Sequence, residues 1–435
     1  MESVTIGFIG LGVGLLLIAM RVQIGVALGV VSFVGIALLL NMRAAWGILT
    51  AVPFNFVGDW TLTAIPMFLL MGYVASASGL SAGLFRAMRI FLSRLPGGLA
   101  ITSVGACAML SAASGSSVAT SSAFARIATP EMLRYRYDPG LASGVVASAG
   151  TLGSLIPPSV LLLLYGYIAE VSIAALFMAG LIPGLLSALM FSGMIIVRVK
   201  LNPTLAPPVT ESFTRAEKVR ALLDVWPLPV LIVGVLVGIV SGVFTPTEAG
   251  GMGAFLAIAI AAMKRTLTLA MLRRAVMDTL TGTASIFMVV IGTVLLTRFM
   301  ALSGVPTFIA DTLLGTATDQ LVVIAMAIVL YLILGCFLDS IGIMLLTLPI
   351  ILPLANGTGM DLIYFGIILV KLLEIGLVTP PVGLNVYVIK GALGNLVSLP
   401  TIFRGVGWFV VVDFVTLSLL IAFPAISLWL PTLLR

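Results

Sequence analysis

Two stretches decide the fold of this chain: Gly150-Thr151-Leu152-Gly153-Ser154-Leu155-Ile156-Pro157-Pro158-Ser159 and Glu374-Ile375-Gly376-Leu377-Val378-Thr379-Pro380-Pro381-Val382-Gly383-Leu384-Asn385. Each lies inside a long apolar segment, at about residues 141–170 and 363–394. Consecutive prolines remove two amide donors and disfavour helical geometry in the preceding residue, so each helix has to unwind there. Unwound backbone at membrane depth is tolerated only where protein or a wet cavity covers it. The two stretches therefore predict broken membrane helices around a buried polar site.

The composition is that of a polytopic membrane protein. Of the 435 residues, 61% are hydrophobic and 9% are charged, which excludes a soluble globular fold. A membrane-spanning helix needs about 20 apolar residues. Apolar segments of this quality occur at about residues 3–20, 22–41, 61–80, 141–170, 172–197, 225–243, 248–263, 278–301, 363–394 and 405–430. The first opens with Glu2 and lacks a small-residue cleavage site, so we interpret it as a retained helix rather than a signal peptide.

Several function classes are excluded by residue usage. The chain has no histidine, which removes Ser-His-Asp and Cys-His nucleophilic sites and histidine proton relays. Cys107 and Cys336 lie in apolar surroundings, so we predict neither a zinc site nor a disulfide framework. The net charge of +6 is spread over loops rather than gathered in a block suited to nucleic acid. We therefore expect neither an enzyme, nor a resident cofactor, nor a nucleic-acid partner.

Two further apolar stretches are interrupted by polar residues and predict re-entrant hairpins. Residues 98–129 are interrupted around Ser114-Gly115-Ser116-Ser117, and residues 320–355 around Gly335 and Asp339. Basic residues gather in the loops that flank the first hairpin and in the connections at 198–220 and 264–274, whereas the connections at 307–319 and 356–361 have none. By the positive-inside rule, the first hairpin opens to the cytoplasm, the second opens to the opposite side, and the N-terminus is outside.

Opposed hairpins imply an inverted repeat. At an offset of 223 residues, Pro130 corresponds to Pro353, Gly153 to Gly376, and Pro157-Pro158 to Pro380-Pro381. The matches occupy equivalent places after each hairpin and within each broken helix. We predict an all-α fold with about 10–12 transmembrane helices and two opposed re-entrant hairpins in an inverted repeat.

The breaks offer oxygen ligands for a hard cation such as sodium. Carbonyls freed at Gly153 and Gly376 would be joined by the hydroxyls of Ser114, Ser116, Ser117 and Thr379. Half-helix N-termini beginning at Ser159 and Val382 point partial positive charge inward, which suits an anionic substrate. Proline kinks and packed serines are common in membrane helices, so one motif alone would indicate packing; two matched pairs favour a transport site.

Three other polar positions are notable. Lys371 and Glu374 are three residues apart, and we interpret them as a local neutralising pair. Asp339 has no basic neighbour in sequence and is a functional candidate, because carboxylates within membranes are costly. Thr245-Pro246-Thr247-Glu248 predicts a structural capping box.

Motifs spread over nearly the whole chain resemble the large membrane subunit of TRAP (tripartite ATP-independent periplasmic) transporters. In chain order they are Ser114-Gly115-Ser116-Ser117, Gly153-Ser154-Leu155-Ile156-Pro157-Pro158-Ser159, Pro183-Gly184, Phe244-Thr245-Pro246-Thr247-Glu248-Ala249-Gly250, Pro349-Ile350-Ile351-Leu352-Pro353 and Thr379-Pro380-Pro381-Val382-Gly383. The resemblance implies a bacterial inner-membrane transporter subunit that imports an organic acid by sodium symport. It also implies an elevator mechanism, a small four-helix membrane subunit and a periplasmic substrate-binding protein as partners.

The resemblance also implies an assignment of regions and residues. We expect scaffold helices at 1–60, a first repeat at 61–200, a cytoplasmic linker with connecting scaffold helices at 201–277, and a second repeat at 278–435. The implied sodium ligands are Ser114, Ser116, Gly153 and Ile156 at a first site, and Gly335, Gly376 and Thr379 at a second. Candidate substrate contacts are Ser117, Ser159, Asp339, Val382 and Asn385. A stand-alone sodium/dicarboxylate carrier, a channel and a respiratory-complex membrane subunit remain alternatives.

Overall fold

The computed structural model describes residues 2–208, 213–314, 319–335 and 338–433. The predictions for Cys336 therefore lie outside the described residues. The helices before residue 202 are α1 (Glu2–Ala19), α2 (Ile24–Leu39), α3 (Met42–Val57), η1 (Trp60–Thr63), α4 (Ala64–Ala77), α5 (Leu80–Leu92), α6 (Gly98–Ser114), α7 (Ser117–Arg134), α8 (Pro139–Ala149), η2 (Gly150–Ser154), α9 (Val160–Ile168) and α10 (Ile173–Leu201). The helices after it are η3 (Pro203–Leu205), α11 (Arg215–Val225), α12 (Pro227–Val240), α13 (Pro246–Met263), α14 (Leu269–Ser303), α15 (Val305–Leu314), α16 (Gln320–Gly335), α17 (Ser340–Gly357), α18 (Leu362–Val378), α19 (Leu384–Leu393), α20 (Leu399–Ala422) and α21 (Ala425–Leu433).

The described residues form an all-helical, multi-pass membrane fold. Six helices are long and apolar enough to cross a bilayer: Trp60–Ala77, Ile173–Leu201, Pro246–Met263, Leu269–Ser303, Ser340–Gly357 and Leu399–Ala422. A seventh span arises if α11 and α12, bent by 42°, are taken together. Shorter apolar helices include α1, α2, α6, α16 and α19. Our prediction of about 10–12 spans also counted the shorter apolar helices α1 and α2, and it took each broken helix, which the structure divides at its double proline, as one span.

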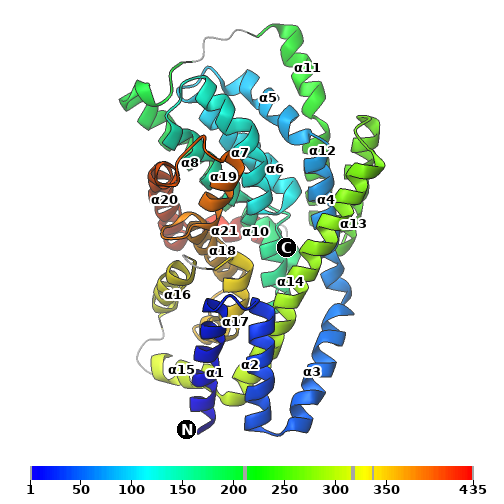
Figure 1. The fold of residues 1–435 in the computed structure, drawn as a ribbon, viewed down its shortest axis with the longest axis vertical. Coiled ribbons are helices and arrows are strands. Elements are labelled where there is room, and N and C mark those ends of the chain that lie inside the picture. Colours follow the sequence, from blue (N-terminus) through cyan, green and yellow to red (C-terminus); the bar gives the residue numbers. More distant parts are fainter. Residues whose placement is uncertain (1, 209–212, 315–318, 336–337, 434–435) are drawn as a thin grey trace.

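One side of the molecule is a bundle of long helices (Figure 1). The 35-residue helix α14 runs diagonally through it and packs against α2 and α4, while α4 also packs against α13. A small apolar core around Phe299 and Met300 joins α14 to α2. The capping box at the start of α13 is confirmed, because the Thr245 side chain accepts from the Glu248 amide and the Glu248 carboxylate reaches back to the Thr245 amide.

The other side holds the two hairpins and the two broken helices. The hairpin of α6 and α7 lies in the upper half of Figure 1, and α17 of the second hairpin lies in the lower half. The first hairpin turns at Gly115 and Ser116 and is followed by α8, η2 and α9. The second hairpin is followed by α18 and α19. The structure thus confirms both predicted hairpins and both broken helices.

The breaks fall at the double prolines. Regular helix stops after Ser154 and resumes at Val160 in the first, and stops after Val378 and resumes at Leu384 in the second. Both Pro-Pro peptide bonds are cis. The two breaks differ in exposure: Pro157 and Pro158 are buried, whereas Pro380 and Pro381 are exposed.

The predictions missed helices α3, α5, α11 and α15. Helix α3 was missed because Arg43, Pro53 and Asn55 interrupt its hydropathy, although Pro53 is accommodated inside the helix. The segment with Arg86 and Arg89, expected as a loop, forms the amphipathic helix α5, and part of the connection at 307–319 forms α15. Helix α14 begins nine residues before residue 278, where the predicted span starts. Hydropathy detects only the apolar part of this helix and misses the charged turn that contains the Arg274–Asp278 pair.

Candidate functional site

Both hairpin tips and both breaks meet at one cavity of about 620 Å³. Helices α4 and α14 of the long-helix bundle line another side of this cavity. The residues that line it include Tyr73, Ser117, Ser154, Gly282, Ser285, Asp339 and Ser340. Its wall is mostly apolar with a few polar groups, as is usual for a small-molecule site, and no lysine or arginine is among the described residues that line it.

Four helix N-termini border this cavity. Residues in the first turns of α7, α9, α17 and α19 line it, namely Ser117, Val160, Ser340 and Leu384. Their N-caps are Ser116, Ser159, Asp339 and Gly383. Because each helix N-terminus carries a partial positive charge, four of them make the cavity attractive to an anion without any cationic side chain.

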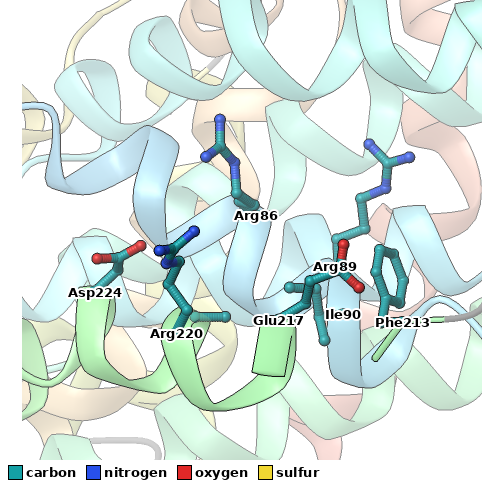
Figure 2. Close-up of a pocket in the computed structure, with 8 residues that line it drawn as sticks. Arg86, Arg89, Ile90, Phe213, Glu217, Arg220 and Asp224 are labelled. Atoms are coloured by element: carbon teal, nitrogen blue, oxygen red, sulfur yellow. The ribbon is translucent and has the colours of Figure 1, made fainter. Parts of the chain in front are cut away.

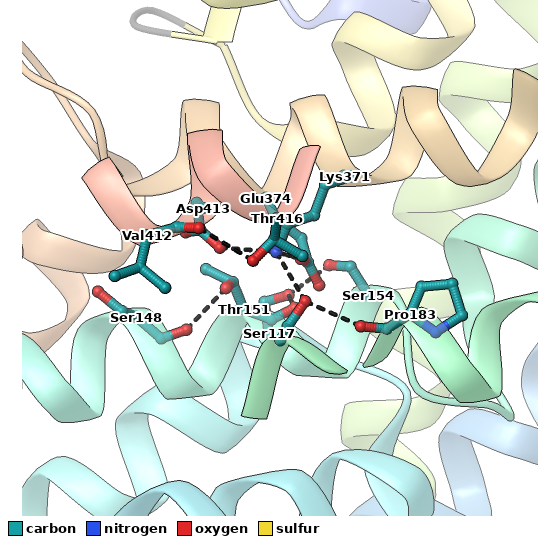
Figure 3. A network of polar contacts seen from close by, with 11 residues as sticks. Ser117, Ser148, Thr151, Ser154, Pro183, Lys371, Glu374, Val412, Asp413 and Thr416 are labelled. Carbon is teal, nitrogen blue, oxygen red and sulfur yellow. Dashed lines mark hydrogen bonds and ion pairs between the residues drawn. The ribbon is translucent and has the colours of Figure 1, made fainter. Parts of the chain in front are cut away.

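The tip of the first hairpin packs directly on the first break. Gly115 has φ +58°, and a Cβ there would stand 2.9 Å from the Pro158 carbonyl oxygen, so only glycine fits without displacing backbone. The Ser117 and Ser154 hydroxyls lie 2.6 Å apart (Figure 3). The geometry therefore fixes the tip against the break.

Three of the four residues predicted for the first sodium site come together here. A Cβ on Gly153 would stand 3.1 Å from the Ser116 carbonyl carbon, and the Ser114 hydroxyl lies 2.8 Å from that of Thr120. Ile156 is also buried beside the break, and its side chain faces Gly184 of α10. The structure thus gathers hydroxyl and backbone oxygens from the tip and the break within one small region.

The second hairpin meets the second break in the same way. A Cβ on Gly335 would stand 2.8 Å from the Gly376 Cα, so α16 and α18 touch backbone to backbone at these glycines. The Thr379 hydroxyl, at the end of α18, donates to the Ile375 carbonyl at 2.6 Å and keeps its oxygen lone pairs available. The three residues predicted for the second sodium site therefore belong to one helix–helix contact and the turn that follows it.

The predicted substrate contacts divide into two groups. Ser117 and Asp339 line the cavity, and the Asp339 carboxylate also caps α17 by accepting from the Gly342 amide at 3.1 Å. The other group does not line the cavity and comprises Ser159, Val382 and Asn385. Each of these lies within two residues of a residue that lines the cavity. Asn385 is buried, donates to the Ala147 carbonyl at 3.3 Å, and leaves its Oδ1 without a hydrogen-bond partner.

The wall contributed by α4 and α14 was not predicted. Tyr73, Gly282 and Ser285 lie in long apolar segments, where nothing local distinguishes a cavity-facing residue from a lipid-facing one. Only the packing of the bundle against the hairpins brings them to the site.

An ionic cluster lies on α18 close in sequence to the second break (Figure 3). The Lys371 ammonium donates to Glu374 at 3.0 Å, which confirms the predicted pair, but it also donates to Asp413 at 2.6 Å and to Ser187 at 3.0 Å. All three charged side chains are fully buried. The cluster therefore joins α10, α18 and α20, and Asp413, a carboxylate inside a predicted span, was the signal that could have revealed it.

A second, charged cavity of about 570 Å³ lies between α5 and α11 (Figure 2). Arg86, Arg89, Glu217, Arg220 and Asp224 line it. Arg89 also bonds to Glu131 and to the Tyr135 hydroxyl, both at 2.5 Å. Neither hairpin tip and neither break lines this cavity, so it is separate from the candidate site.

Comparison with known proteins identifies the family. The family model described as "Tripartite ATP-independent periplasmic transporter, DctM component" matches residues 11–426. This chain belongs to the DctM family of TRAP transporters. The resemblance seen in the sequence motifs is thereby confirmed, and this TRAP permease is a transport protein rather than an enzyme.

The names of relatives of this TRAP permease give different substrates. A C4-dicarboxylate TRAP transporter large permease from Pseudomonas aeruginosa is 34% identical over 86% of this chain and 86% of its own length. A sialic acid TRAP transporter large permease from Vibrio cholerae is 30% identical over 87% of both chains. An isethionate TRAP transporter permease, DctMQ, from Oleidesulfovibrio alaskensis is 32% identical over 82% of this chain and 57% of that longer protein.

A solved structure supports the fold. The YdaH transporter of Alcanivorax borkumensis superposes with a TM-score of 0.62 over 90% of each chain, at 15% sequence identity. At that identity the likeness concerns the fold alone.

Proposed function

We propose that this TRAP permease imports an organic anion by sodium symport through the cavity between its hairpin tips. One observation carries the proposal: four helix N-termini and two glycine-bearing breaks converge on one cavity. No cationic side chain is among the described residues that line this cavity. The N-termini would hold the carboxylate or sulfonate of the substrate, and the oxygens at each break would hold sodium.

This electrostatic arrangement supports an anionic substrate. C4-dicarboxylates, sialic acid and isethionate, which the relatives' names give, are all anions. Asp339 would face the neutral, hydrogen-bond-donating part of the substrate, such as a hydroxyl, because its own charge disfavours a carboxylate. Ser117 and the break residues Ser159, Val382 and Asn385 would complete the contacts once the site closes.

The transport motion that we propose is an elevator-type displacement of the hairpin side against the long-helix bundle. The cavity supports this, because Tyr73, Gly282 and Ser285 come from the bundle while the remaining polar wall comes from the hairpin side. A bifunctional thiol reagent that links Ser285→Cys to Ser340→Cys should stop uptake. Uptake that continues with the link in place would rule out the sliding motion.

The family description and the loop charges support a proposal about the partners and the membrane. We propose that a small four-helix membrane subunit and a periplasmic substrate-binding protein complete the transporter in the bacterial inner membrane, with the N-terminus on the periplasmic side. The family description, which names a tripartite transporter, supports the first part, and the basic loops support the second. Liposomes with this chain alone should take up little substrate, and full activity would favour a stand-alone carrier.

The deciding experiment concerns sodium. With all partners reconstituted and the membrane potential held fixed, uptake of radiolabelled succinate, sialic acid or isethionate should require an inward sodium gradient. Ser116→Ala and Thr379→Ala should each raise the half-maximal sodium concentration about five- to fifty-fold by removing an oxygen ligand. Ser32→Ala and Ser418→Ala are matched controls, because both hydroxyls only donate to the carbonyl one turn earlier. Uptake that persists when choline replaces sodium would refute the coupling.

A further inference from the structure

A groove unrelated to the central cavity lies between the C-terminal end of α10 and the N-terminal half of α20. Its volume is about 580 Å³, and its walls are largely apolar side chains of α10 together with Trp408 and Val412 of α20. Arg198 and Asn202 lie at one end of it. Both helices are long and apolar enough to span the membrane, so a groove on their outer surface would face the bilayer.

The arginine at the polar end lacks a partner for one of its donors. The Arg198 guanidinium lies 5.2 Å over the Trp408 ring, and its Nη1 is buried without a hydrogen-bond partner. Asp138 interacts with it electrostatically, but no ion pair joins the two, and the Asp138 carboxylate instead accepts from the Leu141 amide at 2.8 Å. A buried donor without an acceptor is costly, so the site favours an anionic oxygen supplied from outside the chain.

Further positive charge lies at the same end. Arg404 is exposed and precedes Trp408 by four residues, which places both on one face of α20. Lys200 is exposed at the end of α10, two residues after Arg198. An anion that meets Arg198 would therefore also be attracted by these two cations.

The apolar part of the groove is open to the hydrocarbon. Leu189 and Val197 are 70% and 57% exposed on α10. Gly193 lies between them, and a Cβ added there would meet no atom within 4 Å. The groove thus combines an open apolar surface with a guanidinium at one end.

We propose that this groove binds a phospholipid with an anionic headgroup, such as phosphatidylglycerol. The phosphate meets the planar fork of Arg198, and one acyl chain lies along Gly193. Zwitterionic phosphatidylcholine fits the apolar groove equally well but carries no net charge, so the cationic end selects between the two lipids.

Quenching of Trp408 fluorescence by brominated lipids tests this proposal on the full chain in vesicles. The other four of the five tryptophans are replaced by phenylalanine, leaving Trp408 as the reporter. Brominated phosphatidylglycerol should quench it with an apparent affinity about five- to thirty-fold higher than brominated phosphatidylcholine. The control is a chain that keeps only Trp60. This tryptophan is 71% exposed, and residues 44 to 85 around it contain no Lys or Arg. Its quenching should show no preference between the two lipids.

Two variants separate the headgroup from the acyl chain. Arg198→Gln should remove most of the preference for phosphatidylglycerol while leaving quenching by phosphatidylcholine unchanged. Gly193→Leu should weaken quenching by both lipids, whereas Gly234→Leu, at an equally open glycine of α12, should change neither. The proposal is overturned if Arg198→Gln keeps the preference for phosphatidylglycerol, or if both lipids quench the starting chain equally. It is also overturned if millimolar inorganic phosphate abolishes the preference, because the groove would then bind free anions.

Discussion

Replacing Gly335 by alanine tests the proposed second sodium site most directly. The added methyl would stand 2.8 Å from the Gly376 Cα, whereas carbon atoms in contact prefer about 3.5–4.0 Å. Helices α16 and α18 therefore have to separate by about 0.7–1.2 Å. Overpacking of this kind costs about 1–3 kcal/mol. Because the displaced backbone includes the proposed sodium ligands at Gly335 and Gly376, this cost should appear in sodium affinity as well as in stability.

Sodium-dependent stabilisation of the purified chain measures the effect without partners or substrate. A ligand that binds only the folded state raises the unfolding temperature as its concentration passes its Kd. For Gly335→Ala, the sodium concentration at which the unfolding temperature begins to rise should be between about fivefold and a hundredfold higher than for the unaltered chain, with choline chloride as the ionic-strength control.

Gly391→Ala in α19 is the matched control, because a Cβ there meets nothing within 4 Å. It should leave the sodium dependence unchanged. Normal sodium dependence in Gly335→Ala would refute the assignment of this glycine contact as an ion site, even if the variant were less stable.

Three other outcomes follow from the structure. Lys371→Met should destabilise the protein by about 3–5 kcal/mol in detergent unfolding, because it leaves two buried carboxylates without a cation, whereas Asp413→Asn should cost clearly less because a neutral Lys–Glu pair remains. Gly282→Val should lower uptake about tenfold or more with an unchanged unfolding temperature, since the new side chain enters the central cavity. Backbone and side-chain hydrogen bonds from Thr214 lower the pKa of Glu217, so this cap of α11 contributes fully above the ordinary glutamate pKa and is lost as pH falls through the lowered value. The protection of α11 amides, taken relative to the intrinsic exchange rate at each pH, should therefore fall below about pH 4, and Glu217→Ala should abolish that pH dependence.

The sequence predicted the elements that local chemistry determines. Pro157-Pro158 and Pro380-Pro381 located both breaks, because a missing amide donor acts on its own helix whatever surrounds it. The polar hairpin tips were recognisable for a related reason, since few structures tolerate Ser114-Gly115-Ser116-Ser117 inside an apolar segment.

Contacts between distant helices were not predictable in this way. Asp413 lies 42 residues after Lys371, and no local pattern links them. The wall residues Tyr73 and Ser285 join the cavity only through the packing of α4 and α14 against the hairpin tips. Periodicity indicates which segments are helices, but it does not specify which face of one helix meets which face of another.

The four helix N-termini at the central cavity have a consequence for how this site tolerates change. Each contributes a charge of about +0.5, so together they supply about two positive charges that reside in the backbone, of which the Asp339 carboxylate offsets about one. No single side-chain substitution deletes them, and no change of pH titrates them away. The attraction for the proposed anionic substrate would thus be a property of chain topology, which would leave the lining side chains free to diverge among relatives whose names give a dicarboxylate, a sugar acid or a sulfonate.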